Sequence, residues 1–230
     1  MEKVVNNLSY RYERKSFVSN FSIEEIEGLI KLHPFMFSKI YYPRFVNSIY
    51  LDTFNMSNFL ENMDGLSERV KVRIRWYNDL FGIVTNPVLE IKIKRALLGT
   101  KKIYKLKSFK FDKNFSIESI RDIIKESNIQ NDIKKDLEKM NGAVIIRYKR
   151  KYFQSVNKKF RITLDKNIEY RSIQKFNNRF LEKKTDYNNI IFELKYDEKN
   201  DELAKHVFSE FPFRMTRNSK YISGIENFIM

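Results

Sequence analysis

The sequence contains no cysteine and only two histidines, His33 and His206. The absence of cysteine excludes disulfides, thiolate metal sites and a cysteine nucleophile. Two histidines are too few for the usual histidine-based zinc sites. No Ser–His or Cys–His nucleophilic pair can be read from the sequence, so any chemistry must depend on other groups.

Glycine, proline and long apolar runs are also scarce. Six glycines and four prolines in 230 residues leave no low-complexity linker and no clear domain boundary. No stretch of about 18 apolar residues predicts a transmembrane helix. The N-terminal stretch MEKVVNNLSYRYERK lacks the apolar core of a signal peptide. We therefore expect one domain over residues 1–230, without a transmembrane segment and located in the cytoplasm.

Positive charge is abundant. The chain has 44 basic and 29 acidic residues, a formal net charge of +15, and 42% hydrophobic residues. The hydrophobic fraction is sufficient for a sizeable core in a chain of this length. The charge predicts an anionic partner, which could be nucleic acid, an anionic membrane or a phosphorylated small molecule.

The stretch RVKVRIRWY, residues 69–77, alternates strictly between cationic and apolar residues. This period of two predicts a β-strand with Arg69, Lys71, Arg73 and Arg75 on one face, about 6.6 Å apart along the strand. Like charges at this spacing repel by roughly 2 kcal/mol at an effective dielectric constant near 20. The row is therefore either a solvated face or a face that meets carboxylates or an anionic ligand.

Other predicted strands carry the same alternation of charged and apolar residues. The charged positions share one face within each strand: Arg11, Glu13 and Lys15; Glu90, Lys92 and Lys94; Arg161, Thr163 and Asp165; Glu193 and Lys195; and Tyr148 with Arg150. One open sheet with a solvated face would explain the pattern. Alternatively, a closed barrel of about eight strands would place the charged faces inside and the apolar faces outward against helices.

The order of the predicted elements is typical of an α+β domain with a mostly antiparallel sheet, because no regular βαβ rhythm appears. We expect eight or nine strands and four or five helices. A capping box of Ser22 and Glu25 predicts where the first helix begins. The expected strands cover residues 8–18, 46–53, 69–77, 88–96, 102–111, 143–155, 159–167 and 189–197. The expected helices cover residues 22–30, 55–65, 116–127, 130–142 and 201–211, followed by a short polar-to-apolar segment at 217–228.

Short motifs along the chain resemble the VTC domain, in the order in which that family has them. These motifs are YERK, SIYLDT, RVKVRIRWY, LEIKIK, IIRYKRKYF with RITLD, FELKYD and SKY, and the resemblance extends from about Tyr10 to Gly224. The VTC domain is the polyphosphate polymerase domain of the vacuolar transporter chaperone complex, and it also occurs as stand-alone bacterial proteins. It belongs to the triphosphate tunnel metalloenzymes, which are relatives of the CYTH phosphatases.

The resemblance implies an antiparallel β-tunnel that binds ATP and inorganic polyphosphate. It implies transfer of the γ-phosphate of ATP to a growing polyphosphate with Mn²⁺ or Mg²⁺, and a membrane protein as a potential partner. It assigns phosphate binding to Lys15, Arg73, Arg75, Lys92, Arg150, Arg161, Lys195 and Lys220. It assigns metal binding to Glu193 and Glu13, and it makes Arg73, Arg75, Lys220 and Glu193 the expected catalytic set.

The first strand departs from the pattern of the CYTH relatives. They begin with Glu-x-Glu-x-Lys, whereas this chain has Arg11 at the first position. One carboxylate is replaced by a cation, which favours phosphate-chain binding or polymerisation over a two-metal triphosphatase. Glu90 and Asp165 are candidate structural carboxylates, and we expect Trp76, Tyr148 and Tyr221 to be packing residues.

Other functions remain open from the residues alone. One is a tunnel triphosphatase that uses the same site, and another is a non-catalytic module that binds polyphosphate or inositol phosphates. A nucleic-acid binder would instead carry its cations on outer loops beside exposed aromatic residues. Here the cations alternate within strands and are interleaved with glutamate, so no nucleic-acid partner is expected.

Overall fold

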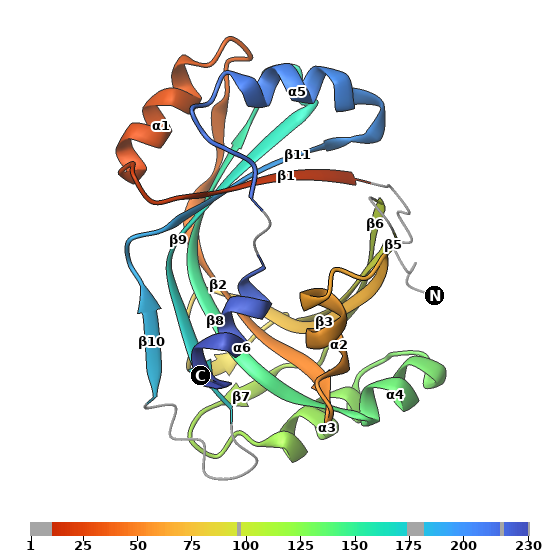
Figure 1. Cartoon of the computed structure of the whole chain (residues 1–230). Helices are drawn as coiled ribbons and strands as arrows, with labels where there is room; N and C mark the ends of the chain where they lie inside the picture. The colour runs from red at the N-terminus through yellow and green to blue at the C-terminus, as the bar shows by residue number, and fades with distance from the viewer. Residues whose placement is uncertain (1–10, 96–97, 174–181, 217–218, 230) are drawn as a thin grey trace.

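The computed structural model describes residues 11–95, 98–173, 182–216 and 219–229, and within them the chain forms a strongly curved sheet with helices on both of its faces (Figure 1). The strands are β1 (Arg11–Val18), β2 (Ser38–Thr53), β3 (Glu68–Tyr77), β4 (Gly82–Val84), β5 (Val88–Arg95), β6 (Leu98–Lys105), β7 (Phe109–Phe111), β8 (Met140–Gln154), β9 (Phe160–Ser172), β10 (Lys183–Asp186) and β11 (Ile190–Asp197). The α-helices are α1 (Ile23–Leu32), α2 (Ser57–Met63), α3 (Ile117–Glu126), α4 (Asn131–Glu138), α5 (Asp201–Ser209) and α6 (Lys220–Ile229).

The main sheet is antiparallel, with the order β1-β11-β9-β8-β2-β3-β5-β6, and β10 pairs with β9 beside this path. The short strands β4 and β7 form a separate pair. This arrangement confirms the predicted α+β class and mostly antiparallel sheet. The predicted closed barrel is not confirmed, because among the described residues the hydrogen-bonded path ends at β1 and β6 without a ladder between them.

Alternation along β3 separates its two kinds of side chain. Val72, Ile74 and Trp76 are almost completely buried and pack with α3 and α4 on the convex face of the sheet. Arg73 lies on the opposite face, where it bonds to Glu90. The prediction that the cations and the apolar residues of this strand face opposite ways is therefore confirmed, as is the packing role of Trp76.

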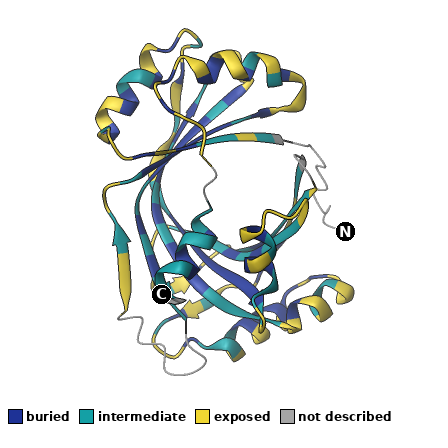
Figure 2. Ribbon diagram, in the orientation of Figure 1, coloured by how far each residue is buried: buried dark blue, intermediate teal, exposed yellow. Residues whose placement is uncertain are grey.

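A second apolar core covers the other half of the convex face. It joins α1 and α5 to the outer faces of β1, β9 and β11, and Phe192 is fully buried at its centre. The predicted capping box of Ser22 and Glu25 is present and begins α1. In Figure 2 both helices turn exposed residues outward and buried residues towards the sheet.

Helix α6 lies on the concave face, within the curve of the sheet (Figure 1). Its Tyr221 and Ile225 pack against Tyr50, Tyr148 and other residues of β2, β8 and β9, and we call this group the α6 core. A Cβ at Gly224 would lie only 3.1–3.2 Å from side-chain atoms of β8 and β9, so glycine permits the close approach. The prediction that the helices pack outside the sheet is wrong for α6 and also for α2, whose Phe59 packs against Tyr221 in the same core.

The other errors lie at element boundaries. The helix predicted for 130–142 ends at Glu138, and β8 begins at Met140. The strand predicted for 102–111 divides into β6 and β7, while the short strands β4 and β10 were not predicted. The segment predicted for 217–228 forms α6 from Lys220, and residues 217 and 218 lie outside the described part. Within the described ranges, each helix is too short or too polar to cross a membrane.

Candidate functional site

Cationic side chains from most strands of the main sheet gather on the concave face, beside the N-terminal end of α6. Alternation within the strands and the contacts described below place them there, because each strand turns its apolar positions to the convex cores. The cations are Lys15, Lys71, Arg73, Arg75, Lys92, Lys101, Arg150, Arg161, Lys195 and Lys220. They outnumber the carboxylates with which they form ion pairs, which are Glu13, Glu90, Asp165 and Glu193.

The first group, which we call the Glu90 cluster, consists of Glu90, Arg73, Arg75 and Lys101. Two guanidinium nitrogens of Arg73 donate to Glu90 Oε2 at 2.6 and 2.8 Å. Arg75 and Lys101 approach Glu90 Oε1 at 2.8 and 3.0 Å. The side chain of Glu90 is only 2% exposed, so three cations surround one buried carboxylate.

The Nε of Arg75 is buried and has no hydrogen-bond partner among the described residues. A buried cationic donor without an acceptor is costly, because its water has been removed and nothing replaces it. The Arg75 guanidinium therefore has bonding capacity that Glu90 does not use.

The second group, which we call the Glu193 cluster, consists of Glu193, Asp165, Lys15, Arg150, Lys195 and Lys220. Arg150 donates to both carboxylate oxygens of Asp165, at 2.5 and 2.6 Å, and Lys220 Nζ lies 2.5 Å from Asp165 Oδ2. Lys195 and Lys15 lie 2.8 and 3.2 Å from Glu193. Arg150 and Lys220 complete its surroundings at 3.6 and 3.7 Å.

Glu13 connects strands that are far apart along the hydrogen-bonded path. Lys92 of β5 donates to Glu13 Oε2 of β1 at 3.0 Å. Lys15 Nζ lies 3.2 Å from the same oxygen and 3.2 Å from Glu193 Oε1. The two ends of the curved sheet are therefore held together by an ion-pair network, although no ladder joins them among the described residues.

The buried carboxylates of both clusters stay ionised. Burial alone raises the pKa of Glu193, but Lys15, Lys195 and the neighbouring cations lower it well below its ordinary value. Burial likewise opposes ionisation of Glu90, and the guanidinium groups of Arg73 and Arg75 reverse the effect and lower its pKa. These carboxylates act as fixed negative charges that hold the cations in place.

Tyrosine rings lie between the two clusters. Arg73 donates to the Tyr50 hydroxyl at 3.1 Å. The ring centre of Tyr148 lies 4.8 Å from Lys220 Nζ and 5.1 Å from the Arg150 guanidinium. Both rings belong to the α6 core, so the helix that contributes Lys220 also packs the wall behind the cations. The predicted packing role of Tyr148 and Tyr221 is confirmed by their burial.

Glu13 and Glu193 are the carboxylates of the concave face that could hold a divalent ion together. No group of three acidic or histidine side chains suited to a metal occurs among the residues that the structure describes. Glu13 and Glu193 are nevertheless neighbours, since the Lys15 ammonium contacts both. Mg²⁺ often binds through one or two carboxylates together with substrate phosphates. Glu13 and Glu193 therefore fit a divalent ion that also binds substrate phosphates. Such an ion would compete with Lys15 for the carboxylate oxygens.

The structure brings nearly all of the sequence-predicted site residues together, either in the two clusters or in the contacts of Glu13 with Lys15 and Lys92. Arg161 lies on the same face of β9 as Asp165 but makes no ion pair with another described residue. Arg11 stands where the CYTH pattern has a glutamate, and its side chain lies outside the described part. Sequence reasoning missed Lys101, although it lies opposite Lys92 in the antiparallel pair of β5 and β6.

Lys71 was also absent from the predicted set, although its strand position pointed to the same face. Its Nζ donates to Ser219 Oγ at 2.7 Å, just before α6. Burial, with repulsion from Lys15 and Lys92, lowers the pKa of Lys71 to about 7. The unfolded chain therefore binds this proton more strongly than the folded protein does. Without ligand, stability attributable to Lys71 should rise with pH between that value and the ordinary lysine pKa.

Anion binding should show the opposite trend. Lys71 is charged below pH 7 and loses its charge as the pH rises to 8, so its attraction for phosphate is lost over this range. We expect the tripolyphosphate affinity of the wild type to fall about tenfold relative to that of a Lys71→Arg variant, which stays charged. Isothermal titration at pH 6 and pH 8 measures this ratio. Parallel pH profiles for the two proteins would show that Lys71 does not titrate beside the ligand.

The arrangement suits a ligand with several adjacent negative groups. Charge-assisted bonds from lysine and arginine to phosphate oxygens are stronger than neutral hydrogen bonds. Cations from both ends and the middle of the sheet face one concave surface, so one chain of phosphoryl groups could contact both clusters. The excess of cations also means that such a ligand would relieve repulsion within the protein.

A family model described as the VTC domain matches residues 10–229 of the chain. No curated protein sequence matches significantly. Three similar solved structures share the fold at low sequence identity. One is a Hippeastrum protein named for adenylyl cyclase and described with a dominant triphosphatase activity, with a TM-score of 0.55, 12% identity and 96% of each chain covered.

The other two structures come from a bacterium and an archaeon. A Vibrio parahaemolyticus protein named for adenylate cyclase has a TM-score of 0.53 and 13% identity, with 94% of this chain and 98% of that chain covered. The PH1819 protein of Pyrococcus horikoshii has a TM-score of 0.52 and 13% identity, with 95% and 99% covered. At these identities the likeness concerns the fold alone.

Proposed function

The chain belongs to the VTC domain family, and we propose that it binds ATP and inorganic polyphosphate on the concave face and transfers the γ-phosphate of ATP to the polyphosphate end. The observation that carries the proposal is the excess of cations over carboxylates there, together with the unpartnered Nε of Arg75. In this proposal residues 1–230 act as one domain in the cytoplasm, where ATP is available, and the sheet closes around its ligand as a tunnel.

The proposed reaction needs no nucleophilic side chain. The terminal oxygen of polyphosphate forms the new P–O bond to the γ-phosphorus, and the bond to the β-phosphate oxygen breaks as ADP departs with the electron pair. Positioning and neutralisation of charge supply most of the catalysis in phosphoryl transfer. We assign these tasks to Arg73, Arg75 and Lys220, while Lys15, Lys92, Arg150, Arg161 and Lys195 bind the remaining phosphoryl groups.

A divalent ion, Mn²⁺ or Mg²⁺, would be held by Glu193 and Glu13, and when bound it would neutralise charge on the phosphoryl oxygens. Lys15 lies between these carboxylates when phosphate is absent. Lys15 therefore keeps the two carboxylates close without a metal, and phosphate could draw its ammonium away when the ion binds.

The second candidate is a triphosphatase, in which water replaces the polyphosphate end as the acceptor. The similar Hippeastrum protein, which is described with this activity, favours considering it. Arg11 weighs against a triphosphatase, because it replaces a glutamate of the CYTH pattern. The first strand then offers one carboxylate, Glu13, instead of two. Purified protein with ATP and Mn²⁺ distinguishes the candidates: a polyphosphate ladder on a stained gel indicates synthesis, and orthophosphate alone indicates hydrolysis. Neither product would indicate a binding module or a partner-dependent enzyme, and a membrane protein is the partner class we would test.

Ligand binding by itself is tested by thermal unfolding. Tripolyphosphate at one hundred times its dissociation constant should add about 2.7 kcal/mol to the free energy of unfolding. For a chain of this size the melting temperature should rise by roughly 5–10 °C. Salt at about 0.5 M should weaken the effect by screening. A large shift with single-stranded oligonucleotides and none with tripolyphosphate would support the nucleic-acid interpretation instead.

An Arg75→Ala variant connects this binding to the concave face. Loss of one charge-assisted contact costs about 1.5–3 kcal/mol, which corresponds to a tripolyphosphate affinity lower by about 10- to 150-fold. Arg121→Ala is the matched control, because Arg121 forms an exposed pair with Glu118 on α3, behind the convex face. Equal losses of affinity in the two variants would show only a general effect of net charge.

A further inference from the structure

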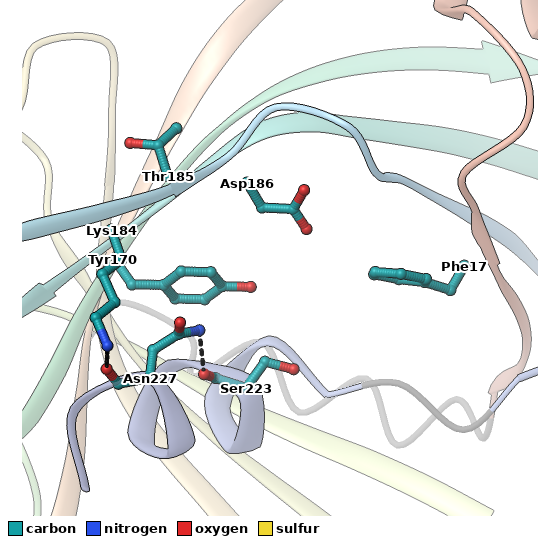
Figure 3. Close-up of a pocket in the computed structure, with 7 residues that line it drawn as sticks. All are labelled: Phe17, Tyr170, Lys184, Thr185, Asp186, Ser223 and Asn227. Carbon is teal, nitrogen blue, oxygen red and sulfur yellow. Dashed lines mark hydrogen bonds between the residues drawn. The ribbon is translucent and has the colours of Figure 1, made fainter. Parts of the chain in front are cut away.

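A cavity of about 360 Å³ lies where α6 approaches β1, β9 and β10, and it belongs to neither cation cluster (Figure 3). Its volume is within the range of small-molecule pockets. Its lining residues are Phe17, Tyr170, Lys184, Thr185, Asp186, Ser223 and Asn227. We call it the α6 cavity.

Polar groups converge on the α6 cavity beside one aromatic ring. In Figure 3 the Tyr170 hydroxyl, the Asp186 carboxylate and the Ser223 side chain point towards a common space, and the ring of Phe17 from β1 lies across that space, seen edge-on. Tyr170 is only 5% exposed, yet its hydroxyl makes no hydrogen bond with another described residue. Burial and the nearby Asp186 raise its pKa, so the hydroxyl remains a donor. The cavity therefore offers donors and acceptors around a flat apolar surface.

Asp186 gives the cavity its electrostatic character. Its Oδ1 accepts hydrogen bonds from the backbone N–H groups of Asn188 and Asn189 and from the Asn189 side chain. Its Oδ2 accepts a bond from the Asn189 side chain alone. Asp186 forms no ion pair within the described ranges. Lys184 does not neutralise it, since its Nζ donates to the Asn227 carbonyl. One carboxylate oxygen thus remains available to a neutral donor, and phosphate would be repelled.

The α6 cavity adjoins the Glu193 cluster on two elements. Phe17 follows Lys15 by two residues on the same face of β1, which is about 7 Å along a strand. Ser223 follows Lys220 by three residues, one turn of α6. The register of β1 and β11 places Phe17 opposite Ile191 and Lys15 opposite Glu193. A ligand of the cavity could therefore extend directly into the phosphate-binding cations.

We propose that the α6 cavity binds the adenine ring of a nucleoside triphosphate whose phosphates occupy the cation clusters. The inference rests on the proposed function and adds the part of the substrate that tripolyphosphate lacks. The ring stacks on Phe17, and its exocyclic amino group donates to Asp186 Oδ2. Hydroxyl donors of Tyr170 and Ser223 are available to the ring nitrogens. Oδ2 accepts one bond from Asn189 and can accept one more, which suits an amino group, whereas a 6-oxo base would place an oxygen against the carboxylate.

The test compares ATP, ITP and tripolyphosphate by isothermal titration without metal. ITP carries a 6-oxo group in place of the amino group and a hydrogen on N1, so it is the control ligand that lacks the exocyclic donor. The wild type should bind ATP about tenfold or more tightly than ITP, since the bond is made to a charged acceptor. Asp186→Asn should remove or invert this preference, while tripolyphosphate affinity should stay the same or rise because a repelling charge is lost. The asparagine oxygen can still accept the bonds from the turn at Asn188 and Asn189.

A second variant keeps the inference testable if Asp186→Asn disturbs its turn. Phe17→Ala should weaken ATP about fivefold or more by loss of stacking, with tripolyphosphate unaffected. Two results would overturn the proposal that the α6 cavity binds adenine. One is equal affinity of the wild type for ATP and ITP, and the other is an unchanged preference for ATP over ITP in both variants. Failure of the wild type to bind tripolyphosphate would overturn the proposed function, and this inference with it, so the two failures are distinguishable.

Discussion

An Asp165→Asn variant is expected to be strongly destabilised and then rescued by a polyanion. Asp165 is fully buried and bonds to both Arg150 and Lys220, whose side chains are 10% and 9% exposed. Removing one partner of a buried ion pair leaves uncompensated charge and costs about 3–5 kcal/mol. For a chain of this size the melting temperature should fall by roughly 6–20 °C.

The rescue distinguishes this site from an ordinary structural ion pair. Phosphoryl groups can replace the lost carboxylate beside Arg150 and Lys220, so saturating tripolyphosphate should raise the melting temperature of Asp165→Asn more than that of the wild type. Glu202→Gln is the matched control, because Glu202 pairs with Lys205 on α5 and its side chain is 84% exposed. Such an exposed pair contributes less than about 1 kcal/mol, and no extra rescue is expected. Equal ligand effects in all three proteins would show that the phosphates bind elsewhere.

Asp165 also illustrates how a single strand limits prediction from the sequence. In β9 it alternates with Ile162 and Leu164, which was enough to place it on the charged face. Its importance depends on Arg150 from β8 and Lys220 from α6, and no local pattern encodes these distant partners. Strand alternation therefore gives the face of a residue, and tertiary contacts decide whether its charge is solvated or buried.

The closure of the sheet shows a similar limit. Alternating charges in successive strands pointed to an interior charged face, and the concave clusters have this composition. The same pattern could not establish whether β1 and β6 pair. In the structure the connection between the sheet ends is made by side chains, Lys92 with Glu13, and not by a backbone ladder among the described residues. Side-chain bridges between strands remote in sequence leave no periodic signal.

Helix α6 was the least predictable part of the site. Its sequence has a polar start and an apolar remainder, but the position of such a helix on the concave face depends on a surface made by β2, β8 and β9. Gly224 was a weak local signal, since a glycine within a helix often marks close packing. The position of the helix decides the roles of three residues at once. Lys220 joins the Glu193 cluster, Tyr221 packs in the α6 core, and Ser223 lines the α6 cavity.

The separation of binding from turnover is best tested at Glu193. Glu193→Gln removes a negative charge from among Lys15, Lys195 and the other cations of its cluster. Metal-free tripolyphosphate should therefore bind as well as, or more tightly than, it binds the wild type. Synthesis of polyphosphate from ATP with Mn²⁺ should nevertheless fall by about 100-fold or more, because the proposed ion loses a ligand.

Glu90→Gln is the matched control, since Glu90 is equally surrounded by cations but has no contact with Glu13 or Glu193 among the described residues. It should also bind tripolyphosphate as well as, or more tightly than, the wild type does. Because Glu90 positions Arg73 and Arg75 and lies away from the proposed ion, any loss of synthesis should be the same at every Mn²⁺ concentration, whereas the loss in Glu193→Gln should lessen as Mn²⁺ is raised. If Glu193→Gln instead loses affinity as Arg75→Ala is expected to do, then Glu193 is a structural partner of the cations. If it keeps full synthesis, the ion binds elsewhere, and Glu13 or Glu90 becomes the better candidate ligand.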